Sequence, residues 1–205
     1  MQFNDDQLRF PKDVRIEDII LIQHTKQGVS LINIFAELNL YEDMYSSTMS
    51  GDVTLVDGTN LPMNADITGQ DKIFFSFFTP GPTPQKISMV MNVYKISERT
   101  IENDKKQVYT LHFASTEAIY NAFRRVSRGF EGYQHDWIQN IVREQWGLSS
   151  LRTVSFDQTK YETFCVIPRW EPLKAIQWIT QRSICADNNM PDIYRDWETD
   201  RKSVV

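Results

Sequence analysis

The side chains of this chain that could carry out chemistry are few and widely spaced. Its three histidines, His24, His112 and His135, fall in separate predicted elements, and its two cysteines, Cys165 and Cys185, form no CxxC pair. Zinc sites in proteins draw their ligands from closely spaced pairs such as HExxH and CxxC. The sequence therefore predicts no metal site. We interpret His112, which lies inside an apolar strand pattern, as a structural histidine with a satisfied ring.

The sequence also lacks motifs for covalent catalysis and for phosphate binding. No GxSxG elbow precedes a helix, and no GxGxxG or GxxxxGK[ST] loop is present. We interpret the carboxylates at predicted turns as solvated, because no pattern places two of them across a cleft as a glycosidase requires. These carboxylates include Glu42, Asp43, Asp57 and Asp71. We therefore predict no catalytic residue, no cofactor and no enzyme activity.

Three arginines, Arg124, Arg125 and Arg128, lie close together near the end of a predicted helix. Cations at the C-terminal end of a helix offset its dipole, and we favour this interpretation. Two alternatives stay open. One is contact with a phosphate group. The other is phosphorylation of Ser127, because 124–127 also resembles the target of a basophilic kinase.

The composition is that of a globular protein. Of the 205 residues, 41% are hydrophobic and 24% are charged. There are 22 basic and 27 acidic residues, and the resulting net charge of -5 disfavours wrapping of DNA or RNA. The cysteine usage suits a reducing compartment, although a single disulfide stays possible.

The longest apolar run, 19–22, is far shorter than the roughly 20 residues of a membrane-spanning helix. The first residues are polar and acidic, so we expect neither a membrane anchor nor a signal peptide. Aromatic residues make up a generous 12% of the chain. We interpret its tryptophans as core or interface anchors, with a base-stacking platform as the alternative; they are Trp137, Trp146, Trp170 and Trp178.

The first 115 residues carry strand patterns. The longest, 29–40, alternates apolar and polar side chains, which predicts one long strand with an apolar face. Gly28 is expected to supply the positive φ of a hairpin turn before it, and the prolines at 80–84 predict a loop. Six strands separated by turn residues predict a small antiparallel barrel or sandwich. The runs are 15–23, 29–40, 51–57, 73–79, 87–96 and 107–113.

After Ser115 the hydrophobic period becomes helical. Ile119, Phe123 and Val126 recur at helical spacing behind the capping candidates Ser115 and Thr116. The other predicted elements are a helix over 137–146 stopped by Gly147, short strands over 151–156 and 163–167, and a helix that begins at Pro172. The expected fold class is therefore α+β.

Eight segments of the chain follow one another in a recognisable order. They are 41–46, 50–57, 60–62, 67–71, 79–81, 93–97, 109–115 and 167–178, the last reading IPRWEPLKAIQW. In this order the segments resemble the baseplate hub proteins of contractile-tailed phages of the T-even type and their marine relatives. The order is more specific than any one segment, and the resemblance covers about 15–188.

The resemblance implies a virion structural protein with a tail-tube-like β-barrel domain over 15–115 and a helical α+β module over 116–190. Hub proteins of this family assemble as trimers, whose ring adapts the tail tube to the central spike and lines the channel through which DNA passes without specific binding. The implied location is the tail baseplate of the virion, after assembly in the host cytoplasm. Two alternatives stay open: a baseplate-associated enzyme that degrades cell walls, and a tube-initiator or wedge protein that shares the barrel.

The end of the sequence departs from the family. After residue 190 an aromatic strand is expected, and 191–205 instead resembles a non-native tail. We therefore expect a C-terminally truncated hub chain, with a second barrel encoded beyond residue 205.

Overall fold

The computed structural model describes residues 14–25, 27–43, 46–64, 67, 69–80, 86–103, 106–150 and 154–186. They fall into two compact units: the first extends to Ser115, and the second begins at Thr116 and also takes in 46–48. Three predicted segments lie wholly or partly outside the described residues. They are the proline-rich loop at 80–84, the start of the strand expected at 151–156, and the tail at 191–205.

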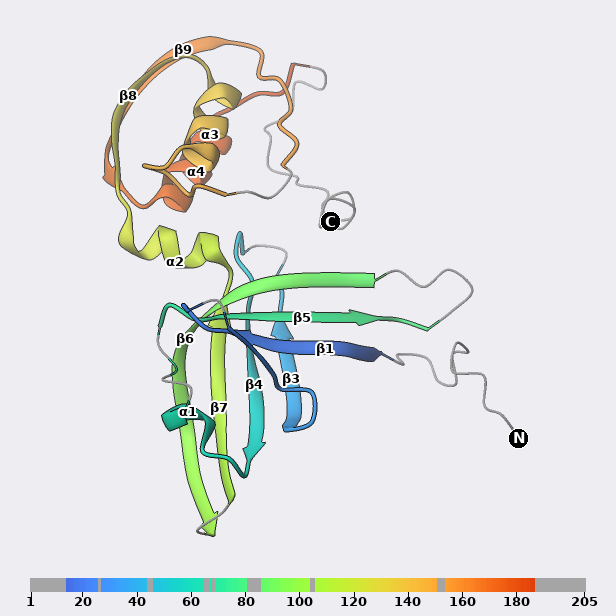
Figure 1. The fold of residues 1–205 in the computed structure, drawn as a ribbon. Helices are drawn as coiled ribbons and strands as arrows, with labels where there is room; N and C mark the ends of the chain where they lie inside the picture. Colours follow the sequence, from blue (N-terminus) through green and yellow to red (C-terminus); the bar gives the residue numbers. More distant parts are fainter. Residues whose placement is uncertain are drawn as a thin grey trace. The chain divides into compact units, whose positions relative to one another are not determined.

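The first unit is one antiparallel sheet of seven strands in the order β2-β1-β5-β6-β7-β4-β3, with a short helix α1 (Leu61–Asn64). The strands β2 and β3 lie at opposite ends of this order, yet only residues 31–34 separate them in the chain. So short a connection spans at most roughly 18 Å, so the sheet must curl, and it forms the half-barrel seen in Figure 1. The strands are β1 (Arg15–Ile22), β2 (Gly28–Ser30), β3 (Phe35–Tyr41), β4 (Ser50–Asp57), β5 (Lys72–Phe78), β6 (Lys86–Asn103) and β7 (Lys106–Ala114).

Alternate side chains of the central strands fill the concave core. Val53 and Leu55 of β4, Phe75 of β5, and Leu111 and Phe113 of β7 are fully buried. Burial of a side chain of this size contributes about 1.5–3 kcal/mol. The predicted strands at 15–23, 51–57, 73–79, 87–96 and 107–113 are thereby confirmed, with β6 extending further than expected.

The predicted long strand at 29–40 is wrong. The chain leaves β2 at Ser30, and a turn over 31–34 carries it to β3 at the other end of the sheet. The N–H of Leu31 donates to Ile19 O at 2.7 Å, and Ile34 O accepts from Val56 N–H at 2.7 Å. Leu31 is buried in the core. The turn over 31–34 consists mostly of apolar residues. Its apolar and polar positions continue the alternation of the flanking strands, so the sequence pattern is that of one continuous strand.

The turn role predicted for Gly28 is also wrong. Among the described glycines only Gly132 has a positive φ. Gly28 lies in β2, where a Cβ would stand 3.3 Å from Cγ2 of Ile20.

A buried carboxylate anchors the end of β4. Asp57 Oδ1 accepts the Thr59 N–H at 2.6 Å and the Thr59 hydroxyl at 2.8 Å, while Oδ2 accepts Leu61 N–H at 2.5 Å and the Tyr109 hydroxyl at 3.3 Å. Burial alone would raise the pKa of Asp57, but these hydrogen bonds outweigh it and lower the pKa. Both Asp57 and Asp71 are fully buried. The prediction of solvated turn carboxylates is therefore wrong for these two.

The second unit packs a two-stranded antiparallel ribbon, β8 and β9, over the helices α3 and α4 (Figure 1). Its core is separate from that of the first unit and includes Val126, Ile141, Ile167 and Ile179, each at most 1% exposed. The elements are α2 (Thr116–Phe123), β8 (Val126–Tyr133), α3 (Gln134–Arg143), β9 (Glu162–Trp170) and α4 (Pro172–Thr180). The predicted helix beginning at Pro172 is confirmed, with proline in its first turn.

The predicted helical stripe of Ile119, Phe123 and Val126 is wrong. The helix α2 ends at Phe123, whose side chain is 83% exposed, and Val126 begins β8 opposite Trp170. The three residues are spaced as on one helix only because two residues separate the end of α2 from the start of β8, at Val126.

The helix predicted to stop at Gly147 ends earlier, at Arg143. The chain reverses there, and Leu148 N–H donates to Ile141 O at 2.7 Å. A Cβ on Gly147 would stand 1.9 Å from that same carbonyl oxygen. Gly147 is therefore required by close backbone approach.

Candidate functional site

The structure does not bring the three histidines together. Each has a polar partner from elsewhere in the chain: the backbone N–H of His24 donates to Asp71, and the rings of His112 and His135 contact the hydroxyls of Ser97 and Thr159. Across the described ranges, no group of three or more His, Cys, Asp and Glu side chains is close enough to hold a metal ion. The thiols of Cys165 and Cys185 are free.

The pair with most chemical interest is Ser97 Oγ and His112 Nε2, which lie 2.5 Å apart on β6 and β7. A serine nucleophile also needs a carboxylate to orient the histidine and donors to bind an oxyanion. Asp52 lies opposite His112 in the register, but its carboxylate accepts from Asn39 Nδ2 at 3.2 Å. No described carboxylate forms an ion pair with the His112 ring. The pair can hold two strands together, as expected for a structural histidine.

The three arginines have separate roles. Arg124 lies over the Tyr120 ring at 3.9 Å and donates to Gly147 O at 2.7 Å. Arg128 lies over the Trp146 ring at 4.4 Å. Arg125 Nη1 donates to three carbonyl oxygens at the end of α2, at 2.7–3.2 Å. The interpretation of a cation at a helix C-terminus therefore describes Arg125.

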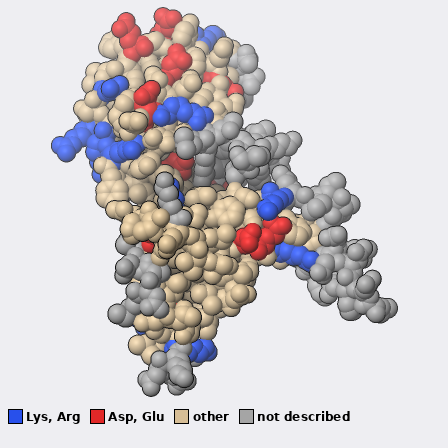
Figure 2. Space-filling model, in the orientation of Figure 1, with Lys and Arg blue, Asp and Glu red and all other residues tan. Residues whose placement is uncertain are grey.

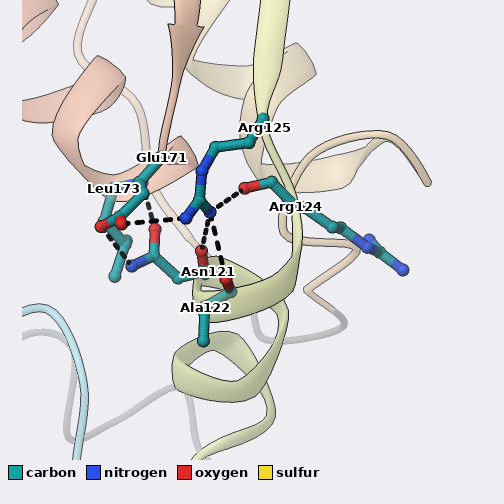
Figure 3. Close-up of polar contacts among 6 residues, drawn as sticks. All are labelled: Asn121, Ala122, Arg124, Arg125, Glu171 and Leu173. Atoms are coloured by element: carbon teal, nitrogen blue, oxygen red, sulfur yellow. Dashed lines mark hydrogen bonds and ion pairs between the residues drawn. The ribbon is translucent and has the colours of Figure 1, made fainter.

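Arg125 also joins α2 to the start of α4 (Figure 3). Its Nη2 lies 3.3 Å from Glu171 Oε1, and Asn121 Nδ2 donates to Glu171 Oε2 at 3.5 Å. Asn121 Oδ1 accepts the Leu173 N–H at 2.9 Å, which satisfies one of the unpaired donors of the first helical turn. This network links residues about 50 positions apart, and sequence reasoning missed it.

The tryptophans pack into the second unit. Trp137 is almost fully buried and donates its Nε1–H to Glu131 O at 3.2 Å. The rings of Trp170 and Trp178 meet edge to face at 5.6 Å, with Lys174 and Arg182 over them. These rings are covered by neighbouring side chains, which favours the core interpretation over a base-stacking platform.

The clearest exposed feature of the second unit is the outer face of the ribbon, which we define as Gly129, Glu131, Phe164 and Val166. Phe164 is 82% exposed and Val166 is 73% exposed. The register pairs Glu131 with Phe164 and Gly129 with Val166, so all four positions share one face. These residues, with the intervening Phe130 and Cys165, line a shallow groove.

The other side of the ribbon is covered. Phe130 and Cys165 pack against the second core, and Ile167 is fully buried. Burial raises the pKa of the Cys165 thiol. Sequence reasoning recognised 163–167 as a strand but missed β8, and so could not place an apolar pair on the exposed face.

The surface drawn in Figure 2 differs between the units. Charged side chains gather over the second unit, whereas most of the described surface of the first unit in this view is uncharged. Among the helices of the described ranges, none has the length and apolar character needed to cross a membrane.

The sequence matches no protein-family model and no curated protein. Among solved structures, the fold is similar to the tail protein from Neisseria meningitidis MC58, with a TM-score of 0.51 and 10% identity over 80% of this chain and 44% of that one. The Francisella PdpA–VgrG complex gives a TM-score of 0.46 at 12% identity, over 76% of this chain and 23% of that one.

The Escherichia coli c3393 protein, described as a type VI secretion component similar in structure to T4 bacteriophage tail proteins, gives a TM-score of 0.42 at 6% identity, over 85% and 42% of the two chains. The chain spans less than half the length of each of these proteins. The likeness shows that the chain shares the fold of the matched part of the Neisseria protein, and the α+β class is confirmed.

Proposed function

We propose that this chain is a structural protein of a phage tail or a related injection apparatus, and specifically a baseplate hub subunit of the virion. The observation that carries this proposal is the order of its parts. A curled seven-stranded sheet followed by a small helical unit matches a tail protein over 80% of this chain. In the proposed assembly three copies form a ring that adapts the tail tube to the central spike.

On the side of the sheet that faces away from the core, the part formed by β3 and β4 suits the wall of a DNA channel. Between the buried residues of β4, Thr54 points to this side, and its hydroxyl lies 3.2 Å from that of Thr110 on β7. Neither β3 nor β4 contains a lysine or an arginine. Because DNA affinity depends on cations that neutralise phosphates, such a surface lets DNA pass with little binding.

We further propose that the chain is not an enzyme. The Ser97–His112 pair lacks an orienting carboxylate among the described residues, which argues against serine hydrolase chemistry. Release of soluble fragments from purified cell walls by this chain would overturn this part of the proposal in favour of the alternative, a baseplate-associated cell-wall-degrading enzyme.

Sedimentation velocity and electron microscopy test the ring. We expect a trimer with threefold particles and an open centre, and no retention of duplex DNA at physiological salt. A chain that stays monomeric at micromolar concentrations, or that binds DNA with a steep salt dependence, would contradict the proposed hub role.

A further inference from the structure

The outer face of the ribbon is unusual for an exposed sheet. Exposed strands are normally protected by charged side chains, by proline or by a covering element. Here the outward positions of β9 are Phe164 and Val166, which are 82% and 73% exposed. Gly129, which lies opposite Val166, has no side chain to cover it, so the face is hollow there. A Cβ on Gly129 would stand 4.0 Å from Cγ2 of Val166. Adjacent exposed apolar side chains of this kind mark an interaction surface.

The backbone edge of β9 is open beside this face. Among the described residues β9 pairs with β8 alone. Pro168 lacks a backbone N–H and Arg169 has a φ of 52°, so these two residues prevent pairing only at the end of the strand. The backbone edge over 162–167 can therefore accept a further strand.

The last described residues do not cover this edge. Cys185 pairs antiparallel with Thr159, and Ala186 N–H donates to Gln158 O at 2.8 Å. At Ala186 the described chain runs antiparallel to 158–160 and away from β9.

On this side of the described ribbon the charged residues are glutamates. Glu131 lies opposite Phe164, and Glu162 lies opposite Tyr133 on the same side of the ribbon. Neither glutamate forms an ion pair with a cation of the described residues. An occupant that approaches this face therefore leaves two carboxylates unpaired unless it supplies lysine or arginine.

We propose that the outer face of the ribbon binds an extended partner segment that alternates apolar and basic side chains and adds as a strand to the open edge of β9. Its apolar side chains contact Phe164 and Val166, and its basic side chains pair with Glu131 and Glu162. Backbone hydrogen bonds supply affinity and the alternating side chains supply specificity. The inference goes beyond the proposed hub role, since it names a docking site that a monomer would also have.

The test uses synthetic peptides of about ten residues, the length of a typical strand. The probe alternates valine with lysine, and the control peptides alternate valine with glutamate and serine with lysine. Binding is followed by calorimetry, and hydrogen exchange of the backbone amides reports whether β9 gains protection. We expect the valine–lysine peptide alone to bind and to protect β9.

Variants of the chain assign the site. Phe164→Ser should weaken binding by about tenfold or more, because the contact of a large apolar side chain is lost. The matched control is Phe123→Ser, since Phe123 is 83% exposed but lies on α2, and it should leave binding unchanged. The double variant Glu131→Lys, Glu162→Lys should reverse the preference toward the valine–glutamate peptide.

Three results would overturn the proposal: no binding of the valine–lysine peptide, equal binding by wild type and the Phe164→Ser variant, or binding without protection of β9. Self-association of the chain that Phe164→Ser abolishes would also overturn it, by assigning the face to a second copy. All four outcomes are distinguishable from failure of the hub role, which would appear as a chain that forms no threefold ring or that retains DNA.

Discussion

At Gly147 the backbone itself fills the space where a side chain would begin. A Cβ there would stand 1.9 Å from Ile141 O, the acceptor for Leu148 N–H. We expect Gly147→Ala to lower the free energy of unfolding by about 2–3 kcal/mol, because the chain reversal after α3 must shift. The measurement is urea unfolding followed by tryptophan fluorescence.

Gly129→Ala is the control for that experiment, because its new Cβ would meet Val166 Cγ2 only at 4.0 Å, an ordinary contact. It should change stability by less than about 0.5 kcal/mol. Equal losses in the two variants would contradict the steric explanation.

The carboxylate of Asp57 should stabilise the first unit through four hydrogen bonds. We expect Asp57→Asn to lower the free energy of unfolding by about 1–3 kcal/mol, because an amide cannot accept all of them. Chemical denaturation followed by far-UV circular dichroism measures the loss. A variant as stable as wild type would show that the amide satisfies the same donors.

Asp57 also gives the stability a pH dependence with a defined sign. Its pKa in the folded protein lies below the ordinary value of 3.8, so the unfolded chain takes up its proton first as the pH falls. Its contribution is fully present above that ordinary value and is lost as the pH falls through the folded pKa. The difference in free energy of unfolding between wild type and Asp57→Asn should therefore become smaller as the pH falls below 3.8. A difference that does not change with pH would show that protonation of Asp57 is not coupled to unfolding.

At the level of single residues, local sequence does not reveal the environment of a side chain. The structural interpretation of His112 agrees with its contact to Ser97. The burial of Asp57 could not be read from its turn position, because its donors include Tyr109, 52 residues away in the chain. Local sequence predicts a turn but not which distant strand covers it.

At the level of elements, the junction of α2 and α4 depends on Arg125. We expect Arg125→Met to lower the stability of the second unit by about 1 kcal/mol, because the last carbonyls of α2 lose a donor and Glu171 keeps only its hydrogen bond from Asn121. Tryptophan fluorescence during urea unfolding measures the effect.

The matched variant is Arg125→Lys, which keeps the charge but not the fork of donors. The stability of its second unit should lie between that of wild type and that of Arg125→Met. If lysine were as damaging as methionine, the shape of the guanidinium would matter and the charge would not.

The element boundaries show what periodicity can and cannot predict. The strands of the central sheet were predictable because Val53, Leu55 and their neighbours alternate over a buried face. The crossing at 31–34 and the start of β8 at Val126 were not, because apolar residues in a turn or at a junction continue the pattern of the preceding element. The ribbon face could not be predicted without β8, since its register with β9 brings Glu131 beside Phe164.

At the scale of the whole molecule, the two separate cores should unfold as separable transitions. All tryptophans follow Ser115, so tryptophan fluorescence reports on the second unit; they are Trp137, Trp146, Trp170, Trp178 and Trp197. We expect Phe113→Ala to destabilise the sheet by about 3–5 kcal/mol and to leave the fluorescence transition in place. Ile141→Ala should shift that transition, whereas the sheet followed by far-UV circular dichroism should persist.

Coincident shifts of both signals in either variant would show one cooperative transition and contradict two independent units.

The strand order of the first unit also affects how the chain folds during synthesis. β1 pairs with β5, which places Ile19 opposite Phe75, and β4 pairs with β7, which places Val53 opposite Leu111. Contacts so far apart in sequence make folding slow. On the ribosome β1 and β4 emerge well before their partners, so their apolar faces stay open to chaperones and to other nascent chains until β7 has been released. The second unit is translated after the first, and its ribbon pairs residues only within Val126–Trp170, so it does not wait for a distant strand.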